Sequence, residues 1–181
     1  MLLLSSKITK SLLSYYFLHE DGSLYVNEIV RRLGVDKRNL VKKLREFEKE
    51  GILASEQKGN QKYYSLNKKY PLYKEYKKIV MKTIGFEEKL RATLNDVKGI
   101  NSAFIFGSYA RDRMDSHSDI DLLVVGAQDT IPLQKQINKL QKEIDREINV
   151  ISISQQEFDS RRKKKDPFIS EIIRKEYLKI I

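Results

Sequence analysis

Two aspartates separated by one residue open an apolar run in the C-terminal half of the chain. They are Asp119 and Asp121, within SDIDLLVV. If this run forms a strand, side chains at i and i+2 point to the same side, so the two carboxylates project together. Neighbouring carboxylates repel each other unless a cation lies between them, and Mg²⁺ commonly binds one or two carboxylates together with phosphate oxygens. We therefore expect Mg²⁺, or Mn²⁺ in its place, at this pair.

A second group of residues suits a phosphate. Gly107 and Ser108 follow the apolar run INSAFIF, and Arg111 and Arg113 come shortly after them. Where a strand turns into a short helix, backbone N–H groups and a hydroxyl are available to an anion. A phosphate site beside a magnesium pair is the equipment for phosphoryl chemistry on a nucleoside triphosphate.

The stretch GSYARDRMDSHSDIDLLVV, which begins at Gly107, resembles the signature of the polymerase-beta-type nucleotidyltransferases, especially their minimal domains. The resemblance implies a transfer of a nucleoside monophosphate to a hydroxyl with release of pyrophosphate. It also implies that Gly107 and Ser108 hold the triphosphate and that Asp119 and Asp121 form the catalytic, metal-binding pair. From its place just after the turn, Arg111 is a further expected nucleotide-binding residue. Asp112 departs from the pattern, which commonly has glycine at this position.

A third carboxylate, which the family normally carries on its third strand, is missing. The matching position in REINVISIS is Asn149. Asparagine is neutral and cannot act as a general base, so we expect weakened catalysis. Glu147 would share a face with Asn149 and is the alternative third ligand. A solvent-facing residue at the start of the strand is the simpler interpretation of Glu147.

The elements around these motifs predict a small α/β domain with a mixed sheet over residues 87–181. A helix should follow Thr130 as its N-cap, Ser154 and Glu157 should form a capping box for the next helix, and the chain should end as helix plus tail. His117 is either a nucleotide contact or a surface histidine. The basic run 161–165 is either a nucleic-acid or acceptor contact or a solvated helix face.

The N-terminal part, residues 1–69, resembles the winged helix-turn-helix domains of bacterial and archaeal transcription regulators. Gly34 ends one helix, Asp36 caps a second, and Gly59 with Asn60 forms a hairpin turn. The resemblance implies that the second helix enters the major groove of double-stranded DNA. The implied base contacts are Arg38 and Asn39, and the other expected DNA-binding residues are Lys37, Lys42, Lys43, Lys58 and Lys62.

The distribution of charge favours nucleic acid over protein as the partner of this part. Residues 1–85 hold 18 Lys and Arg against 9 Asp and Glu, whereas residues 86–181 hold 17 against 16. A basic surplus confined to one half is typical of a polyanion-binding module.

Residues 70–86 are expected to form a connecting helix that continues past a bend near Gly85. Its apolar residues recur at four-three spacing, as in a helix that packs on a partner. They are Leu72, Tyr76, Ile79, Thr83, Phe86, Leu90 and Val97. A homodimer is compatible with this pattern.

The composition narrows the class of protein further. The chain has no cysteine and no apolar run of the ~20 residues that a membrane span needs, and the opening MLLLSS is too short for a signal peptide. We expect a cytoplasmic two-domain α/β (α+β) protein. The favoured function is a DNA-binding, transcription-regulator-like protein that binds Mg–nucleoside triphosphate. The alternatives are an active nucleotidyltransferase acting on a protein or nucleic-acid hydroxyl and an antitoxin-like partner in a two-protein system.

Overall fold

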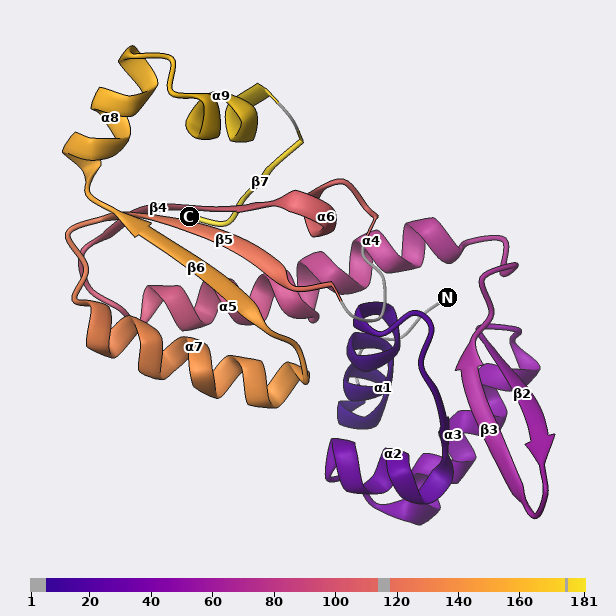
Figure 1. Cartoon of the computed structure of the whole chain (residues 1–181). Coiled ribbons are helices and arrows are strands. Elements are labelled where there is room, and N and C mark those ends of the chain that lie inside the picture. Colours follow the sequence, from indigo (N-terminus) through magenta and orange to yellow (C-terminus); the bar gives the residue numbers. More distant parts are fainter. Residues whose placement is uncertain (1–5, 114–117, 175) are drawn as a thin grey trace. The chain divides into compact units, whose positions relative to one another are not determined.

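The chain divides into two compact units, Met1–Glu88 and Lys89–Ile181, whose elements are labelled in Figure 1. The structure is a computed structural model, and it describes residues 6–113, 118–174 and 176–181. None of the helices in these described ranges is both long and apolar enough to cross a membrane.

The first unit contains helices and a three-stranded antiparallel sheet of order β1-β3-β2. Its elements are α1 (Lys7–Leu18), β1 (Ser23–Tyr25), α2 (Val26–Leu33), α3 (Lys37–Lys49), β2 (Leu53–Lys58), β3 (Gln61–Leu66) and α4 (Tyr73–Thr83). Gly59 and Asn60 join β2 to β3, since Lys58 pairs with Gln61. Gly59 has φ +57°, as a two-residue hairpin turn with glycine first requires.

Local capping explains why α2 and α3 are separate helices. Gly34 ends α2 in the left-handed conformation, with φ +59°. Asp36 then caps α3, because its carboxylate accepts a hydrogen bond from the backbone N–H of Asn39 at 2.9 Å. Leu40, Leu44 and Phe47 are buried on one side of α3.

The predicted packing stripe of the connecting helix is wrong in its first half. Leu72 and Ile79 are each 47% exposed, and α4 buries Val80 and Met81 instead. The helix breaks before α5 (Phe86–Asn95), and a Cβ on Gly85 would lie 2.8 Å from the Cα of Met81. The break changes the phase of the buried stripe, so one four-three repeat cannot describe both helices.

The second unit is built on a mixed four-stranded sheet of order β6-β5-β4-β7, in which only β5 and β6 run parallel. Beyond α5 it contains β4 (Ile100–Phe106), α6 (Gly107–Ala110), β5 (Ile120–Gly126), α7 (Thr130–Ile144), β6 (Ile148–Ile153), α8 (Gln155–Lys163), α9 (Pro167–Arg174) and β7 (Leu178–Lys179). The mixed sheet was expected, whereas the short edge strand β7 was not. The N-cap of α7 is Asp129 rather than Thr130.

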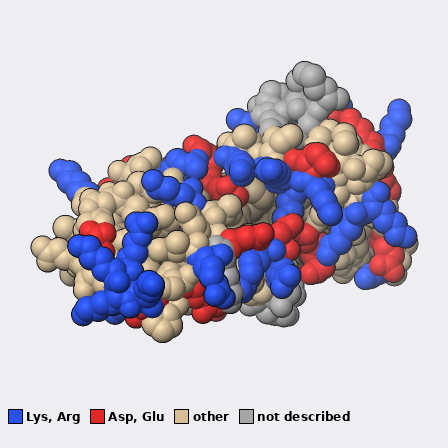
Figure 2. Space-filling model, turned by 90° about the horizontal axis from the view of Figure 1, so that it is seen from above, with Lys and Arg blue, Asp and Glu red and all other residues tan. Residues whose placement is uncertain are grey.

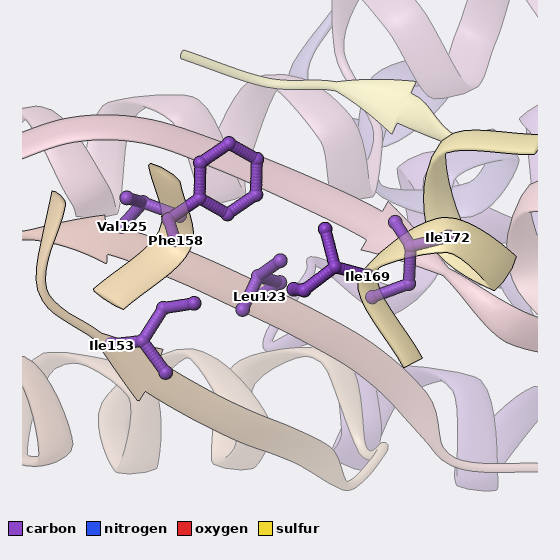
Figure 3. Close-up of a cluster of buried hydrophobic side chains, with 6 residues drawn as sticks. All are labelled: Leu123, Val125, Ile153, Phe158, Ile169 and Ile172. Atoms are coloured by element: carbon purple, nitrogen blue, oxygen red, sulfur yellow. The ribbon is translucent and has the colours of Figure 1, made fainter. Parts of the chain in front are cut away.

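Different helices pack on the two faces of this sheet. Helices α5 and α7 lie on one side and α8 and α9 on the other (Figure 1). Buried side chains on the α8/α9 side form one apolar cluster, shown in Figure 3: Leu123, Val125, Ile153, Phe158, Ile169 and Ile172. Because side chains alternate along a strand, Asp121 points to the same side as Leu123 and Val125.

Candidate functional site

The end of β4 and the start of β5 meet at Gly107 and Asp121. Phe106 is the register partner of Asp121 in the antiparallel pair, so the next residue, Gly107, lies against that carboxylate. Gly107 has φ +74°, and a Cβ there would overlap the carboxylate and lie 3.2 Å from its Cγ. Both conformation and space therefore require glycine at this turn.

The third strand places an amide beside the acidic pair. Asn149 is the parallel register partner of Asp121, and its Nδ2 donates a hydrogen bond to Oδ2 of Asp119 at 3.2 Å. The backbone N–H of Ile120 donates to the carbonyl of Glu147 at 3.0 Å, which holds the start of β5 against β6. The three side chains at the strand edge are thus two carboxylates and one neutral amide.

The electrostatic setting of Asp121 disfavours its ionised form. Burial is the main cause that raises the pKa of Asp121, while the hydrogen bond from Asn149 opposes it. The neighbouring charge of Asp119 raises the pKa further, and the charge of Arg111 lowers it. The net shift is upward, so a cation at this position would relieve an unfavourable charge.

The carboxylate pair has the donor chemistry of a Mg²⁺ site that relies on its substrate for further ligands. Asp121 lies in β5 and Asp119 directly precedes that strand. Both side chains are hard oxygen donors, and Mg²⁺ usually keeps water and phosphate oxygens besides one or two such groups. Among the residues that the structure describes, no three His, Asp or Glu side chains are grouped to hold a metal ion. Glu147 therefore does not complete the pair in this conformation.

Glu147 nevertheless shares a hollow with Asp119. The hollow is open and polar, and Asn138, Gln141 and Lys142 from the end of α7 form one wall of it. Ser118, Asp145 and Arg146 also line it. Arg146 is only 9% exposed and donates to the carbonyl of Ser118 at 3.1 Å, next to Asp119. A buried arginine thus fixes the backbone that carries the first carboxylate.

The expected phosphate residues lie on and after α6. Gly107 and Ser108 begin this short helix, and the backbone N–H of Arg113 donates to the carbonyl of Ser108 at 3.0 Å. Arg111 has a buried Nε without a hydrogen-bond partner in the described part of the chain. Asp112 has φ 52°, a left-handed conformation in which glycine is less strained. His117 lies outside the described residues.

Sequence reasoning missed a cavity of about 190 Å³ next to Gly107. Phe106 and Phe168 line it, and their rings meet edge to face with centroids 5.7 Å apart. The two phenylalanines lie far apart in the sequence, and no local pattern joins them. The one local indication of this cavity in the sequence is an aromatic residue, Phe106, directly before the glycine turn.

The structure gathers part of the predicted DNA-binding set on the outer face of α3. A hollow there is lined by Asp36, Lys37, Arg38, Val41, Lys42 and Arg45, and Asn39 is also exposed. The other three lysines have acidic partners. Lys43 pairs with Glu46 at 2.7 Å, Lys62 with Glu48 at 2.8 Å and Lys58 with Glu56 at 3.1 Å. On the face shown in Figure 2, basic and acidic side chains are likewise interspersed.

The sequence of the second unit matches a known protein family, and the match includes the residues of the candidate site. The family model described as Polymerase beta, Nucleotidyltransferase matches residues 88–178, which is half of the chain. The chain belongs to this family. The match covers β4, the glycine turn, both aspartates and Asn149, so the second unit is a nucleotidyltransferase domain. A search of curated proteins found no match.

Solved structures resemble the nucleotidyltransferase domain at low identity. A toxin–antitoxin complex with AMP-PNP is 20% identical, with a TM-score of 0.40 over 52% of this chain and 72% of the other. A mutant of the toxin–antitoxin MntA–HpeT is 17% identical, with a TM-score of 0.40 over 53% and 73%. A tri-AMPylated Shewanella oneidensis HEPN toxin in complex with MNT antitoxin is 18% identical, with a TM-score of 0.35 over 52% and 68%. Likeness at this level carries no statement about the partner or substrate of this chain.

Proposed function

We propose that the protein is a DNA-binding regulator whose nucleotidyltransferase domain binds a magnesium–nucleoside triphosphate and transfers the nucleotide only weakly. The observation that carries the proposal is the position of Asn149. It occupies the register position beside Asp121 and donates its amide hydrogen to Asp119.

Nucleotide binding is supported by the two carboxylates and the glycine turn. Asp119 and Asp121 would hold the metal ion, with the amide oxygen of Asn149 as a neutral neighbour. A metal ion held by these residues would supply positive charge to the phosphates of the nucleotide. Gly107 keeps the space beside Asp121 clear of a side chain, so the backbone at Gly107 and Ser108 can approach a phosphate closely.

Weak transfer follows from the chemistry of an amide. Asn149 has an acceptor oxygen and two donor hydrogens but cannot accept a proton at neutral pH. A positioned general base is typically worth ~10²–10⁴ in rate, so transfer should be slower by about that factor than with an acid at this position. Binding requires no proton transfer, and it should survive.

DNA binding is supported by the order of elements in the first unit. Helix α2, a turn at Gly34 and helix α3 are followed by the β2–β3 hairpin, as in a winged helix-turn-helix. The exposed face of α3 presents Lys37, Arg38 and Lys42 together. No ion pair within the described ranges engages these three side chains, so their charges are available to phosphates.

One observation favours an active enzyme as the second candidate. Glu147 and Asp119 line the same hollow, and a rotation of the exposed Glu147 side chain could bring its carboxylate to the pair. In that case Glu147 would be the general base, and Glu147→Gln would abolish transfer.

Isothermal titration calorimetry tests the nucleotide-binding part of the proposal. We expect wild type to bind ATP with Mg²⁺ and to lose binding with a chelator. Asp121→Asn should lose binding by a large factor. Asp96→Asn, which removes an exposed carboxylate of the same unit, is the matched control and should bind like wild type. Equal binding by all three proteins, or binding indifferent to the chelator, would contradict the metal assignment.

A further inference from the structure

We propose that the cavity beside Gly107 receives the base of the nucleotide, and that its acidic rim favours a base with an exocyclic amino group. This inference rests on the proposed nucleotide binding and names the kind of nucleotide that the same site takes.

The walls of the cavity suit a flat, neutral ring. Two aromatic side chains and one aliphatic side chain line it, namely Phe106, Phe168 and Ile172. The aromatic rings are nearly perpendicular, at 85°, so the cavity offers a ring face as well as a ring edge. Its 190 Å³ equals the liquid share of roughly six water molecules, which is enough for a planar heterocycle. Stacking on an aromatic side chain is the common way in which proteins hold a base.

The cavity and the carboxylate pair lie on one face of the sheet, so one ligand can reach both. Phe106 and Asp121 are direct partners across β4 and β5, and side chains of such partners point to the same face. Gly107 lines the cavity and also abuts the carboxylate of Asp121. A nucleotide with its phosphates at Asp121 therefore has its base within reach of Phe106.

The charges of the rim distinguish the base from the phosphates as occupant. Among the described residues that line the cavity, Glu171 and Glu176 are acidic and Arg111 is basic. Two carboxylates repel a triphosphate, and the apolar walls offer nothing to a metal ion. Arg111 lines the cavity together with Gly107, which abuts the carboxylate of Asp121. The arginine is thus placed to meet the phosphates of a nucleotide whose base is in the cavity.

The carboxylates also discriminate among bases. A carboxylate only accepts hydrogen bonds, so it favours the amino groups of adenine, cytosine and guanine. Uracil has a carbonyl oxygen where cytosine has its amino group, and that oxygen would face a carboxylate without a hydrogen between them. CTP and UTP are therefore the most closely matched pair of ligands for this test.

The experiment is calorimetry with ATP, CTP, UTP and inorganic tripolyphosphate, each with Mg²⁺, on wild type, Phe168→Leu and Glu176→Gln. Phe168 packs against the apolar cluster, so leucine is used to keep an apolar side chain there, and a melting curve checks the fold. We expect wild type to bind ATP at least about tenfold more tightly than tripolyphosphate, and Phe168→Leu to lose most of this difference. The affinity for tripolyphosphate should not change.

The acidic rim is tested by the ratio of two affinities. CTP should bind about fivefold more tightly than UTP to wild type, and Glu176→Gln should narrow that ratio.

Each other outcome has a definite meaning. If ATP binds no more tightly than tripolyphosphate, or if Phe168→Leu leaves the affinity for ATP unchanged, the cavity does not receive the base. If CTP and UTP bind equally to wild type, the acidic rim does not select an amino group. If neither tripolyphosphate nor any nucleotide binds, the proposed function itself is wrong and this inference is wrong with it.

Discussion

Asn149 lies directly beside Asp121 in the parallel register of β5 and β6. An acid at this position would place a third negative charge next to a carboxylate whose pKa burial already raises. The amide instead donates a hydrogen bond to the neighbouring Asp119 at 3.2 Å. The protein thus keeps two carboxylates together with one neutral group, and we propose that this arrangement holds a metal–nucleotide better than it activates a hydroxyl.

Gly107→Ala should remove nucleotide binding and lower the stability of the nucleotidyltransferase domain. The left-handed conformation at φ +74° alone costs an alanine about 1–2 kcal/mol, and the added Cβ would displace the carboxylate of Asp121. Gly59→Ala is the matched control, because Gly59 has φ +57° and nothing within 4 Å of an added Cβ. The control should show a conformational cost alone, measured by denaturant unfolding, and unchanged nucleotide affinity. Unchanged affinity in Gly107→Ala would show that the turn is not part of the site.

Asp121→Asn should make the ligand-free protein slightly more stable near neutral pH. Burial raises the pKa of Asp121, so its ionisation opposes folding above that pKa, and the penalty fades as the pH falls toward the ordinary value of 3.8. The free energy of unfolding should rise by less than about 1 kcal/mol at pH 7. The gain should shrink near pH 4, because the carboxyl group of Asp121 increasingly takes up a proton there and the cost of burying its charge falls.

Denaturant unfolding of wild type and Asp121→Asn at the two pH values measures this difference. Asp96→Asn should show no gain at either pH. A loss of stability in Asp121→Asn at pH 7 would mean that the ionised carboxylate supports the fold.

Two neighbouring lysines of α3 should differ in their contribution to DNA binding. Lys42 is exposed, whereas Lys43 is bonded to Glu46 at 2.7 Å. Lys42→Ala should weaken binding to duplex DNA of any sequence and reduce the slope of log affinity against log salt by about 0.9. Lys43→Ala should change the slope by less than half of that amount. Fluorescence anisotropy at several salt concentrations measures both slopes, and equal slopes for the two variants would contradict the assigned face.

Parts of the candidate site could be predicted from the sequence, namely those whose local structure depends on short-range rules. The i, i+2 spacing of Asp119 and Asp121 predicts a shared face. The apolar run predicts the strand β5, which carries Asp121 and begins directly after Asp119. The family pattern predicts Asn149 as the third position, and in the structure Asn149 is the register partner of Asp121. Asp36 as the N-cap of α3 needed only the local sequence.

Features that depend on contacts between distant residues could not be read in this way. The edge strand β7 pairs with β4 over two residues, too short a segment to show a strand pattern. The cavity needs Phe168 from α9 beside Phe106 from β4. The ion pair of Lys62 with Glu48 joins β3 to α3, so sequence reasoning counted Lys62 as a DNA contact without its partner. Because the helix breaks at Gly85, the repeat that fits α5 does not continue through α4, and α4 buries Val80 rather than Ile79.

The central claim is that Asn149 leaves a nucleotide-binding site with little transfer activity. Asn149→Asp keeps the size of the side chain and restores a carboxylate beside Asp121. Glu147→Gln is the control that tests the alternative base, because it removes the nearby acid and leaves Asn149 in place. All three proteins are first checked for Mg–ATP binding by calorimetry, so that a loss of transfer is not confused with a loss of binding.

The measurement that tests this claim most directly is pyrophosphate release from ATP with Mg²⁺ by wild type, Asn149→Asp and Glu147→Gln. We predict that wild type binds ATP but releases pyrophosphate at or near the background rate. Asn149→Asp should raise the rate by up to ~10²–10⁴, the usual contribution of a general base, and Glu147→Gln should leave it unchanged. Brisk release by wild type that Glu147→Gln abolishes, or brisk release that neither substitution changes, would contradict the claim.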